Sequence, residues 1–190
     1  LLEAGYGVLA FDLPGHGASS AAPNPEADYN LPAYADLAAA FCEASGVTQP
    51  LLCGWSLGGH IAILMAGNNP DYAGLMIFGT PPIGLNPHDA ANAFLSFEFS
   101  DVTGQEHPSD AQLAGYIAAV YGSTPSIPGA LVKAGQRTDG RSRSCMVAHW
   151  LTGENLHDQS AIVEHWRNPL LIVHGAEDAF VSGDYLQMAW

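Results

Sequence analysis

The chain has 190 residues, of which 48% are hydrophobic, and a formal net charge of -14 at pH 7. This length and apolar content are enough for a sizeable core, and they indicate one domain or one domain with an inserted subdomain. The negative charge repels phosphate backbones and anionic lipid headgroups. We therefore expect neither nucleic acid nor a membrane surface as a partner.

The cysteines and the hydropathy pattern narrow the class of protein further. Cys42, Cys53 and Cys145 are far apart, lack metal-ligand spacing and are odd in number, so they give no disulfide framework. No apolar run approaches the roughly 18 residues of a membrane span, and no signal-peptide pattern opens the chain. No glycine-rich phosphate loop is found either. The sequence predicts no metal and no cofactor, and a reducing, cytoplasmic location.

The predicted elements alternate between strands and helices. The chain opens at Leu1 to Gly5 with the pattern of a last helical turn and its terminal glycine. Alternation of strands and helices predicts an α/β fold with a parallel sheet and helices on both faces. Apolar runs and helical spacing predict strands at residues 6–12, 49–53, 75–78 and 170–173, and helices at 30–46 and 60–66.

A Gly-x-Ser-x-Gly motif lies between the second strand and its helix, at Gly54, Ser56 and Gly58. This context predicts a sharp strand-to-helix turn that exposes Ser56 as a nucleophile. We expect a side chain at Gly54 or Gly58 to collide across that turn. The helix N-terminus favours developing negative charge, and the Leu57 backbone N–H would supply one oxyanion donor.

Residues 81–165 differ in character from the flanking parts and are expected to form an inserted helical cap, with helices at 110–121 and 158–165. All five cationic residues lie at or beyond position 133. The cluster from Lys133 to Arg143 would either attract an anionic group of a substrate or carrier, or simply balance the carboxylates upstream. Aromatic residues of the same segment would line an apolar pocket or belong to its core.

Three motifs together resemble the alpha/beta-hydrolase superfamily, and among its members the capped serine esterases. They are Asp12-Leu13-Pro14-Gly15-His16-Gly17, Gly54-Trp55-Ser56-Leu57-Gly58-Gly59-His60 and His174-Gly175-Ala176-Glu177-Asp178. The resemblance implies that residues 1–80 and 166–190 form the hydrolase core, divided by the cap at 81–165. It also implies that Asp178, in the family's Gly-x-x-Asp motif, is the acid of a catalytic triad.

The third triad member is absent from this sequence. The family order of serine, acid and histidine requires a histidine after Asp178, and none of the eight histidines lies there. His16, His60 and His174 are expected to have structural roles. The family's second oxyanion donor and the strand before it would precede Leu1. We therefore expect an internal fragment with little activity of its own and, because strand edges are left unpaired, a tendency to aggregate.

The function implied by the resemblance is hydrolysis of a small or medium apolar carboxylic ester through an acyl-enzyme on Ser56. One alternative keeps the enzyme but changes the reaction, to perhydrolase or haloperoxidase-type chemistry or to carbon–carbon bond hydrolysis. An alternative of another class is a non-catalytic binding module that keeps the fold and the turn. In the enzymatic cases the expected partner is a small-molecule substrate.

Overall fold

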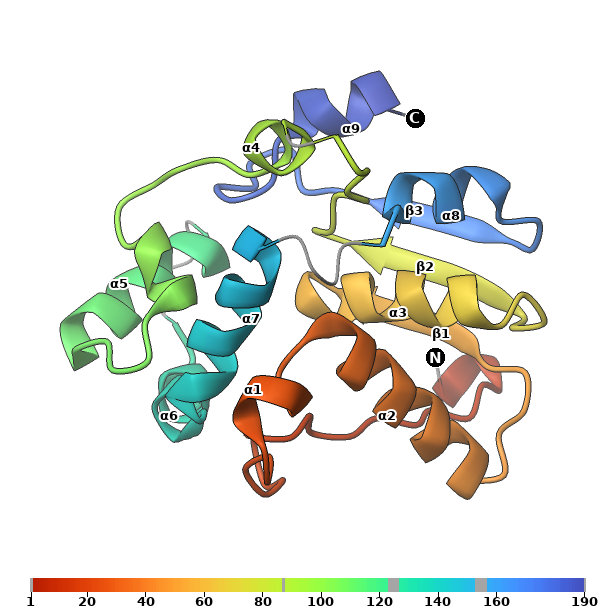
Figure 1. Cartoon of the computed structure of the whole chain (residues 1–190), viewed down its shortest axis with the longest axis horizontal. Helices are drawn as coiled ribbons and strands as arrows, with labels where there is room; N and C mark the ends of the chain where they lie inside the picture. The colour runs from red at the N-terminus through yellow and green to blue at the C-terminus, as the bar shows by residue number, and fades with distance from the viewer. Residues whose placement is uncertain (1, 87, 123–126, 153–156, 190) are drawn as a thin grey trace.

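The computed structural model describes residues 2–86, 88–122, 127–152 and 157–189, and its centre is a parallel sheet (Figure 1). In this part of the chain the sheet has three strands in the order β1 (Leu51–Trp55), β2 (Gly74–Phe78) and β3 (Leu170–Val173). Both pairings are parallel. The strands expected at 49–53, 75–78 and 170–173 are thus confirmed, with small shifts at their ends.

One face of the sheet packs on α3 (Leu57–Asn68), whose residues 59–66 are all buried. Leu52, Leu75 and Ile77 point to this face and are almost completely buried. Because α3 lies between the sheet and other helices, its sequence is apolar on every side rather than on one stripe. Figure 1 shows α2 (Leu31–Ala44) and α8 (Gln159–His165) beside it.

The helix expected at residues 30–46 is confirmed as α2, including its start and stop signals. The Asn30 side chain accepts a hydrogen bond from the Ala33 backbone N–H at 2.9 Å, as an N-cap residue does. Gly46, just beyond the helix, has a φ of 72°, which favours glycine. Similarly, Gly5 has a φ of 84° after a single 3-10 turn at Leu2–Ala4.

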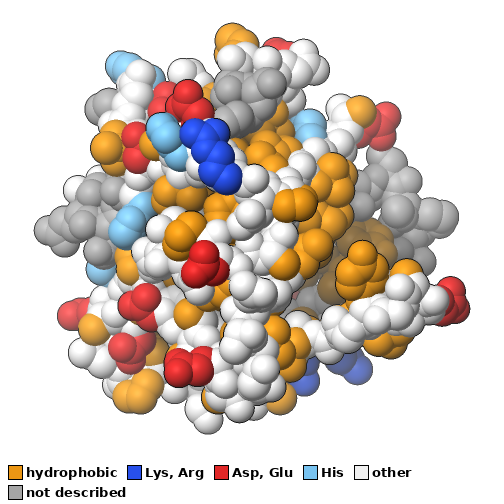
Figure 2. All heavy atoms as spheres, turned by 90° about the vertical axis from the view of Figure 1, so that its right-hand side faces the viewer, with side chains coloured by type: hydrophobic (Ala, Val, Ile, Leu, Met, Phe, Trp, Pro, Cys, Tyr) orange, Lys and Arg blue, Asp and Glu red, His pale blue; other side chains and the backbone are white. Residues whose placement is uncertain are grey.

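The second face of the sheet is open in the described part of the chain. Leu51, Trp55 and Leu171 are 52%, 55% and 52% exposed, and the register places them on the side away from α3. Figure 2 views the molecule from the amino ends of the strands and shows hydrophobic side chains exposed in the middle and on the right of that view. The helices that the structure describes on the sheet therefore cover one face.

The strand expected at residues 6–12 is wrong for this structure. The segment has no strand assignment, and Tyr6, Val8 and Leu9 are 58%, 55% and 47% exposed. A strand requires a neighbour that pairs with its backbone, and none of the described residues does so. Phe11 is held differently, by packing its ring on Phe41 of α2 at 4.3 Å between ring centroids.

The remaining helices lie mostly on the side toward which the strands point (Figure 1). The helix expected at 110–121 is confirmed as α5, and its Ser109 forms a capping box with Gln112. The other elements are α1 (Pro25–Asp28), α4 (Asp89–Ala93), η2 (Ser100–Gly104), α5 (Asp110–Tyr121), α6 (Gly129–Arg137), α7 (Gly140–Thr152) and α9 (Gly183–Ala189).

We call residues 81–165 the cap segment. Helices α4 to α7 lie beside the carboxyl ends of the strands, whereas α8, near the end of the segment, packs on α3. Residues 87, 123–126 and 153–156 of the segment are outside the described residues.

Candidate functional site

Ser56 lies at the turn between β1 and α3 in a conformation that few side chains adopt. Its φ is 51° and its ψ is -118°, and it precedes the first residue of the helix. Backbone strain of this kind costs on the order of 1–3 kcal/mol and is found at functional sites. The strand, turn and helix that the motif predicts are all present.

The glycines around Ser56 keep the turn tight, although one of them differs from expectation. A Cβ at Gly54 would lie 2.2 Å from the Gly58 carbonyl oxygen, so only glycine fits there. The expected collision at Gly58 is wrong, because a Cβ there would meet open space. The second position that needs glycine is Gly59, where a Cβ would lie 2.1 Å from Thr80 Oγ1.

Thr80, in the loop after β2, holds the turn from the other side. Its hydroxyl is within hydrogen-bond distance of the Ser56 carbonyl at 3.0 Å and the Phe78 carbonyl at 3.1 Å. The Ser56 N–H donates to the Phe78 carbonyl at 3.0 Å. Sequence reasoning did not find Thr80, since its contact with Ser56 spans 24 residues.

Leu57 is the first residue of α3. The first N–H groups of a helix have no acceptor within the helix, which leaves the Leu57 N–H available to a ligand. The positive end of the helix dipole is at the same place. Its service as an oxyanion donor stays a prediction, consistent with this location.

Asp178 follows β3 and has one carboxylate oxygen fixed by the backbone. Its Oδ1 accepts hydrogen bonds from the N–H groups of Phe180 at 2.8 Å and Val181 at 2.9 Å. The other oxygen, Oδ2, faces Gly79, where an added Cβ would lie 3.5 Å away. The neighbouring Glu177 is exposed. Asp178 is therefore the better placed of the two carboxylates to receive a hydrogen bond from a histidine.

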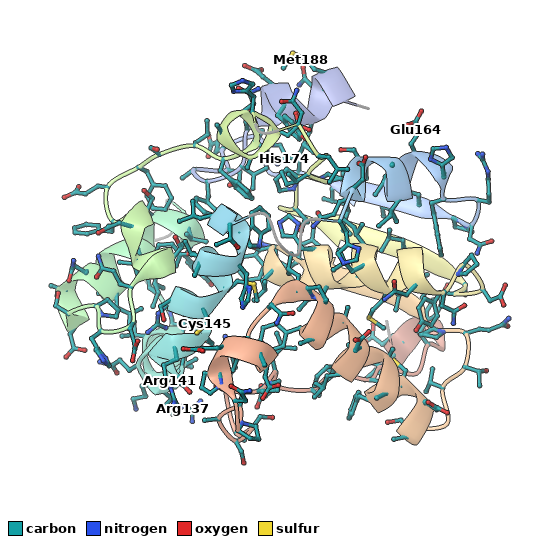
Figure 3. All side chains as sticks on the ribbon, viewed as in Figure 1. Arg137, Arg141, Cys145, Glu164, His174 and Met188 are labelled. Carbon is teal, nitrogen blue, oxygen red and sulfur yellow. The ribbon has the colours of Figure 1, made fainter. Side chains whose placement is uncertain are left out.

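Ser56 and Asp178 lie at the same edge of the sheet, after β1 and β3 respectively, with the end of β2 between them. The carboxyl ends of parallel strands are where ligand crevices open in α/β folds. The histidine nearest to the acid in sequence, His174, follows β3 directly, and Figure 3 labels it there. Its Nδ1 is buried with no hydrogen-bond partner among the described residues.

His60 and His16 make local contacts that are consistent with the structural roles expected for them, which stay a prediction. His60 is 4% exposed and its Nδ1 lies 2.7 Å from Gln159 Oε1. Burial lowers the pKa of His60 to about 4, so its ring is neutral at pH 7. His16 Nδ1 lies 3.1 Å from the Pro14 carbonyl, within its own loop.

The cationic cluster expected to attract an anion is partly neutralised. Arg141 pairs with Asp139 through Nε and Nη2, at 3.0 and 2.8 Å, and this hydrogen bonding holds the pKa of Asp139 down at about 2. Arg143 donates from Nε to the Gln105 carbonyl. Figure 3 shows Arg137 and Arg141 near α6 and α7, well apart from His174 in this view. The charge-balancing interpretation fits Arg141 better than anion binding.

Aromatic rings of the cap segment pack toward the acid loop. Phe94 contacts Trp150, with ring centroids 5.6 Å apart, and Phe180, at 5.3 Å. Phe97 contacts Phe180 at 5.6 Å. Trp55, by contrast, stacks on Phe78 at 6.4 Å on the open face of the sheet. The rings of Phe94, Phe97, Trp150 and Phe180 are only partly buried, so each has apolar surface that a ligand could contact.

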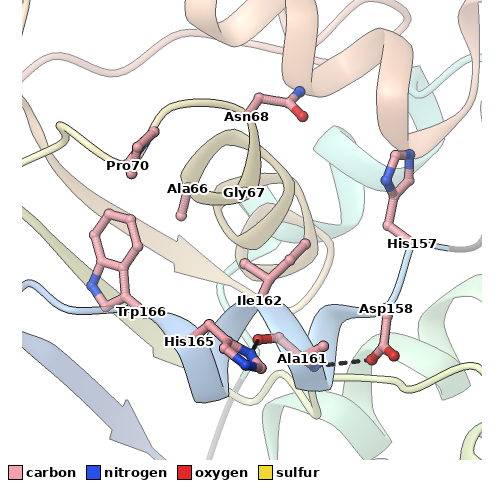
Figure 4. Close-up of a pocket in the computed structure, with 10 residues that line it drawn as sticks. All are labelled: Ala66, Gly67, Asn68, Pro70, His157, Asp158, Ala161, Ile162, His165 and Trp166. Carbon is pink, nitrogen blue, oxygen red and sulfur yellow. Dashed lines mark hydrogen bonds between the residues drawn. The ribbon is translucent and has the colours of Figure 1, made fainter.

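A hollow of about 530 Å³ lies elsewhere, between the end of α3 and α8 (Figure 4). Ala66, on its wall, is ten residues along the helix from Ser56, a distance of about 15 Å. Asp158 and His165 on the opposite wall are engaged in hydrogen bonds with Ala161. We do not assign this hollow to the chemistry of Ser56.

Among the described residues, no group of three or more His, Cys, Asp or Glu side chains is arranged to hold a metal ion. No described helix combines the length and the apolar character that crossing a membrane requires.

Comparison with known proteins defines the class to which this fold and site belong. Residues 1–188 match the alpha/beta hydrolase fold family, and the chain is a member of that family. The solved structure of the N-acyl homoserine lactonase AidH, in complex with N-butanoyl homoserine, superposes with a TM-score of 0.84 at 34% identity. That match covers 92% of this chain and 62% of AidH. A putative aryl esterase from Burkholderia cenocepacia shares the fold, with a TM-score of 0.72 at 20% identity.

Two curated relatives have similar levels of identity. Human Protein ABHD8 is 31% identical over 184 residues, which are 93% of this chain and 39% of that protein. The pimeloyl-[acyl-carrier protein] methyl ester esterase of Aromatoleum aromaticum (strain DSM 19018 / LMG 30748 / EbN1) is 30% identical, over 95% of this chain and 72% of its own length. The chain thus spans well under half of the first of these relatives.

Proposed function

We propose that the whole protein is a serine hydrolase that cleaves carboxylic ester bonds, with Ser56 as nucleophile and Asp178 as the triad acid. The observation that carries the proposal is the strained backbone of Ser56 at a strand–turn–helix, at the sheet edge that also bears the half-buried Asp178. A strained serine at a helix N-terminus, with a hydroxyl that has no hydrogen-bond partner among the described residues, is what the nucleophile of such a turn requires.

The proposed reaction has two steps. Ser56 Oγ attacks the ester carbonyl, its proton passes to a histidine base, and the Leu57 N–H stabilises the oxyanion. The alcohol leaves with that proton, and an acyl-enzyme remains. Water then attacks the acyl-enzyme and regenerates Ser56, with the histidine again moving the proton. Asp178 Oδ2 accepts the second N–H of the histidine, so it fixes the tautomer and stabilises the imidazolium.

This sequence has no histidine after Asp178, so the histidine base is proposed for the whole protein and not for these 190 residues. For the 190-residue chain by itself we expect little turnover. The other enzymatic interpretations, perhydrolysis and carbon–carbon bond hydrolysis, use the same serine and acid and differ in the substrate.

For the substrate class we propose an ester or lactone with an acyl chain of small or medium length. The support is similarity to an N-acyl homoserine lactonase and to a pimeloyl-[acyl-carrier protein] methyl ester esterase. A lactone is a cyclic ester, so Ser56 would open it by the same attack. The partly buried rings of Phe94, Phe97 and Phe180 next to the acid loop would contact an acyl chain.

The test is performed on the protein expressed from its complete reading frame. A fluorophosphonate probe should label Ser56, as mapped by peptide mass spectrometry. Hydrolysis is then measured on p-nitrophenyl butyrate, N-butanoyl and N-hexanoyl homoserine lactones and a pimeloyl methyl ester. Ser56→Ala should abolish labelling and lower kcat/KM by at least about 1,000-fold.

Asp178→Asn is the matched variant for the acid. It keeps an oxygen to accept the Phe180 and Val181 N–H groups but loses the charge that supports the histidine. We expect kcat to fall on the order of 10⁴-fold while the folded structure is kept. Absence of labelling in the wild-type protein would instead favour a non-catalytic binding module. Labelling with no hydrolysis of any ester would favour the other enzymatic reactions.

A further inference from the structure

Two buried polar side chains, 99 positions apart in sequence, meet where α3, the helix after Ser56, packs on the cap segment. His60 is 4% exposed, Gln159 is 2% exposed, and His60 Nδ1 lies 2.7 Å from Gln159 Oε1. The chemistry proposed above uses neither residue. Burying two polar side chains costs more free energy than burying two apolar side chains in their place. The presence of this pair in the core therefore indicates a role other than stability.

The proton on His60 can be located from its neighbours. Gln159 Oε1 also accepts the Ile83 backbone N–H, at 3.4 Å, so the oxygen of this amide faces two donors. The His60 Nδ1 must then carry the proton and donate it. Since burial keeps the ring neutral at pH 7, Nε2 carries none. This hydrogen bond therefore has one direction and one geometry.

The pair connects α3 to α8 and, through α8, to the loop after β2. His60 is one turn after Ser56 on α3, and Gln159 is the first residue of α8. The Gln159 N–H donates to the Ile83 carbonyl at 2.9 Å, which ties α8 to the loop after β2. The same loop contains Thr80, whose hydroxyl lies 3.0 Å from the Ser56 carbonyl.

The ring of His60 also links α3 to the loop of the acid. Its centroid lies 5.1 Å from that of Trp150 in α7 and 6.2 Å from that of Phe94. Phe94 forms an antiparallel bridge with Val181, and the next N–H along the chain, that of Leu95, donates to the Phe180 carbonyl at 2.8 Å. His60 thus lies in a continuous set of contacts between the nucleophile's helix and the loop of Asp178.

We propose that His60 and Gln159 are positioning residues, whose hydrogen bond fixes the cap segment and the loop at 80–83 in the arrangement that aligns Ser56 with the Asp178 loop. This inference rests on the proposed function. A buried hydrogen bond is strong only in one relative orientation of its donor and acceptor, whereas two apolar surfaces can shift against each other at little cost. A misplacement of about 1 Å at a nucleophile is enough to cost about 100-fold in rate.

Three variants of the complete protein separate the hydrogen bond from packing. His60→Phe keeps a ring beside Trp150 and removes the donor. Gln159→Met keeps the length of the side chain and removes the acceptor. His60→Asn places an amide N–H where Nδ1 stood and so restores the donor. We expect His60→Phe and Gln159→Met to lower kcat and the rate of fluorophosphonate labelling about 10- to 100-fold, with KM changed far less. His60→Asn should recover part of the loss.

Tyr29→Phe is the matched control. The Tyr29 hydroxyl donates to Asp139 Oδ2 at 2.8 Å, so this variant also breaks a hydrogen bond between a buried side chain and the cap segment, but one that ends on the residue before α7 and not on α3. It should lower the melting temperature and leave kcat unchanged. Circular dichroism confirms which variants fold; if His60→Phe does not, the comparison of Gln159→Met with His60→Asn decides.

The outcomes distinguish this inference from the function on which it rests. If the wild type is labelled and folded His60→Phe and Gln159→Met are labelled equally fast, the positioning role is wrong and the serine hydrolase stands. If Tyr29→Phe lowers kcat as much as His60→Phe, the effect is general destabilisation and the inference is again overturned. If the wild type is not labelled at all, both proposals fail.

Discussion

Single residues at the site combine local strain with fixed surroundings. Ser56 keeps its positive φ because the Phe78 carbonyl and the Thr80 hydroxyl hold its backbone on both sides. Asp178 keeps one oxygen on backbone N–H groups and leaves the other toward Gly79. The Ser56 backbone and one Asp178 oxygen are thus held by hydrogen bonds, while Ser56 Oγ and Asp178 Oδ2 have no hydrogen-bond partner among the described residues, as preorganised catalysis requires.

His60 gives a prediction about pH at the residue scale. Its pKa is about 4 in the folded chain and about 6.5 when unfolded, because burial disfavours the charged ring. Between these values the unfolded chain binds a proton that the folded chain does not. The contribution of this residue to stability is therefore complete above pH 6.5 and is lost as the pH falls to about 4, by up to about 3 kcal/mol.

The measurement is the free energy of unfolding by urea at pH 7 and pH 4.5, in the wild type and in His60→Phe. The difference between the two pH values should be smaller in the variant, which has no ring to titrate. Asp139, with a pKa of about 2 in the folded chain, loses its contribution mostly below this window. An equal pH dependence in both proteins would contradict the buried, neutral state of His60.

The sequence predicted Ser56 and Asp178 because their motifs are local, but it did not predict their supports. The roles of Thr80 and Gln159 depend on partners 24 and 99 positions away, which no window of a single sequence connects. The sequence points to Gly58 and not to Gly59 for the same reason, since the close neighbour of Gly59 is Thr80 and not a residue of the turn.

At the scale of elements, the turn between β1 and α3 gives a prediction with its own control. Gly54→Ala should destabilise the protein by about 1–3 kcal/mol, because the new methyl group overlaps the Gly58 carbonyl. Gly58→Ala should be neutral or stabilising by up to about 1 kcal/mol, because the site is open and alanine favours a helix. Thermal unfolding of both variants is the measurement. A loss in Gly58→Ala as large as that in Gly54→Ala would contradict the geometry of the turn.

Elements were predicted well where their signal was local and poorly where it was not. The apolar runs of β1, β2 and β3 are short and bounded by Gly, Pro or Asn, which marks buried strands. Residues 6–12 show the same pattern and form no strand, because pairing depends on a neighbour and not on composition. Helix α7 was missed because its first half, from Gly140 to Ser144, is polar and has no apolar stripe.

For the whole molecule, the open face of the sheet predicts self-association of the 190-residue chain. The exposed side chains of Leu51, Trp55 and Leu171 are apolar, and the outer edge of β1 is unpaired among the described residues. Exposed edges and apolar faces are templates for association. We expect concentration-dependent aggregation, measured by size-exclusion chromatography with light scattering.

Leu51→Lys and Leu171→Lys should reduce this aggregation, because each places a charge on the open face. Leu85→Lys is the control, since Leu85 is 59% exposed in a loop away from the sheet. A wild-type chain that stays monomeric up to about 100 μM would contradict the prediction. An equal reduction of aggregation by all three lysine substitutions would also contradict it.

The hydrogen bond between the Thr80 hydroxyl and the Ser56 carbonyl also has a consequence for folding. The positive φ of Ser56 is unfavourable in isolation and is stabilised by hydrogen bonds with Phe78 and Thr80. These hydrogen bonds form only when β2 has paired with β1. The chain between Ser56 and Thr80 must lose the conformational entropy of loop closure before the contacts between these residues can stabilise it. A nascent or partly unfolded chain therefore carries an ordinary serine, and the reactive one arises with the assembled sheet. The rate at which a fluorophosphonate probe labels Ser56 during refolding would thus report the completion of the native state.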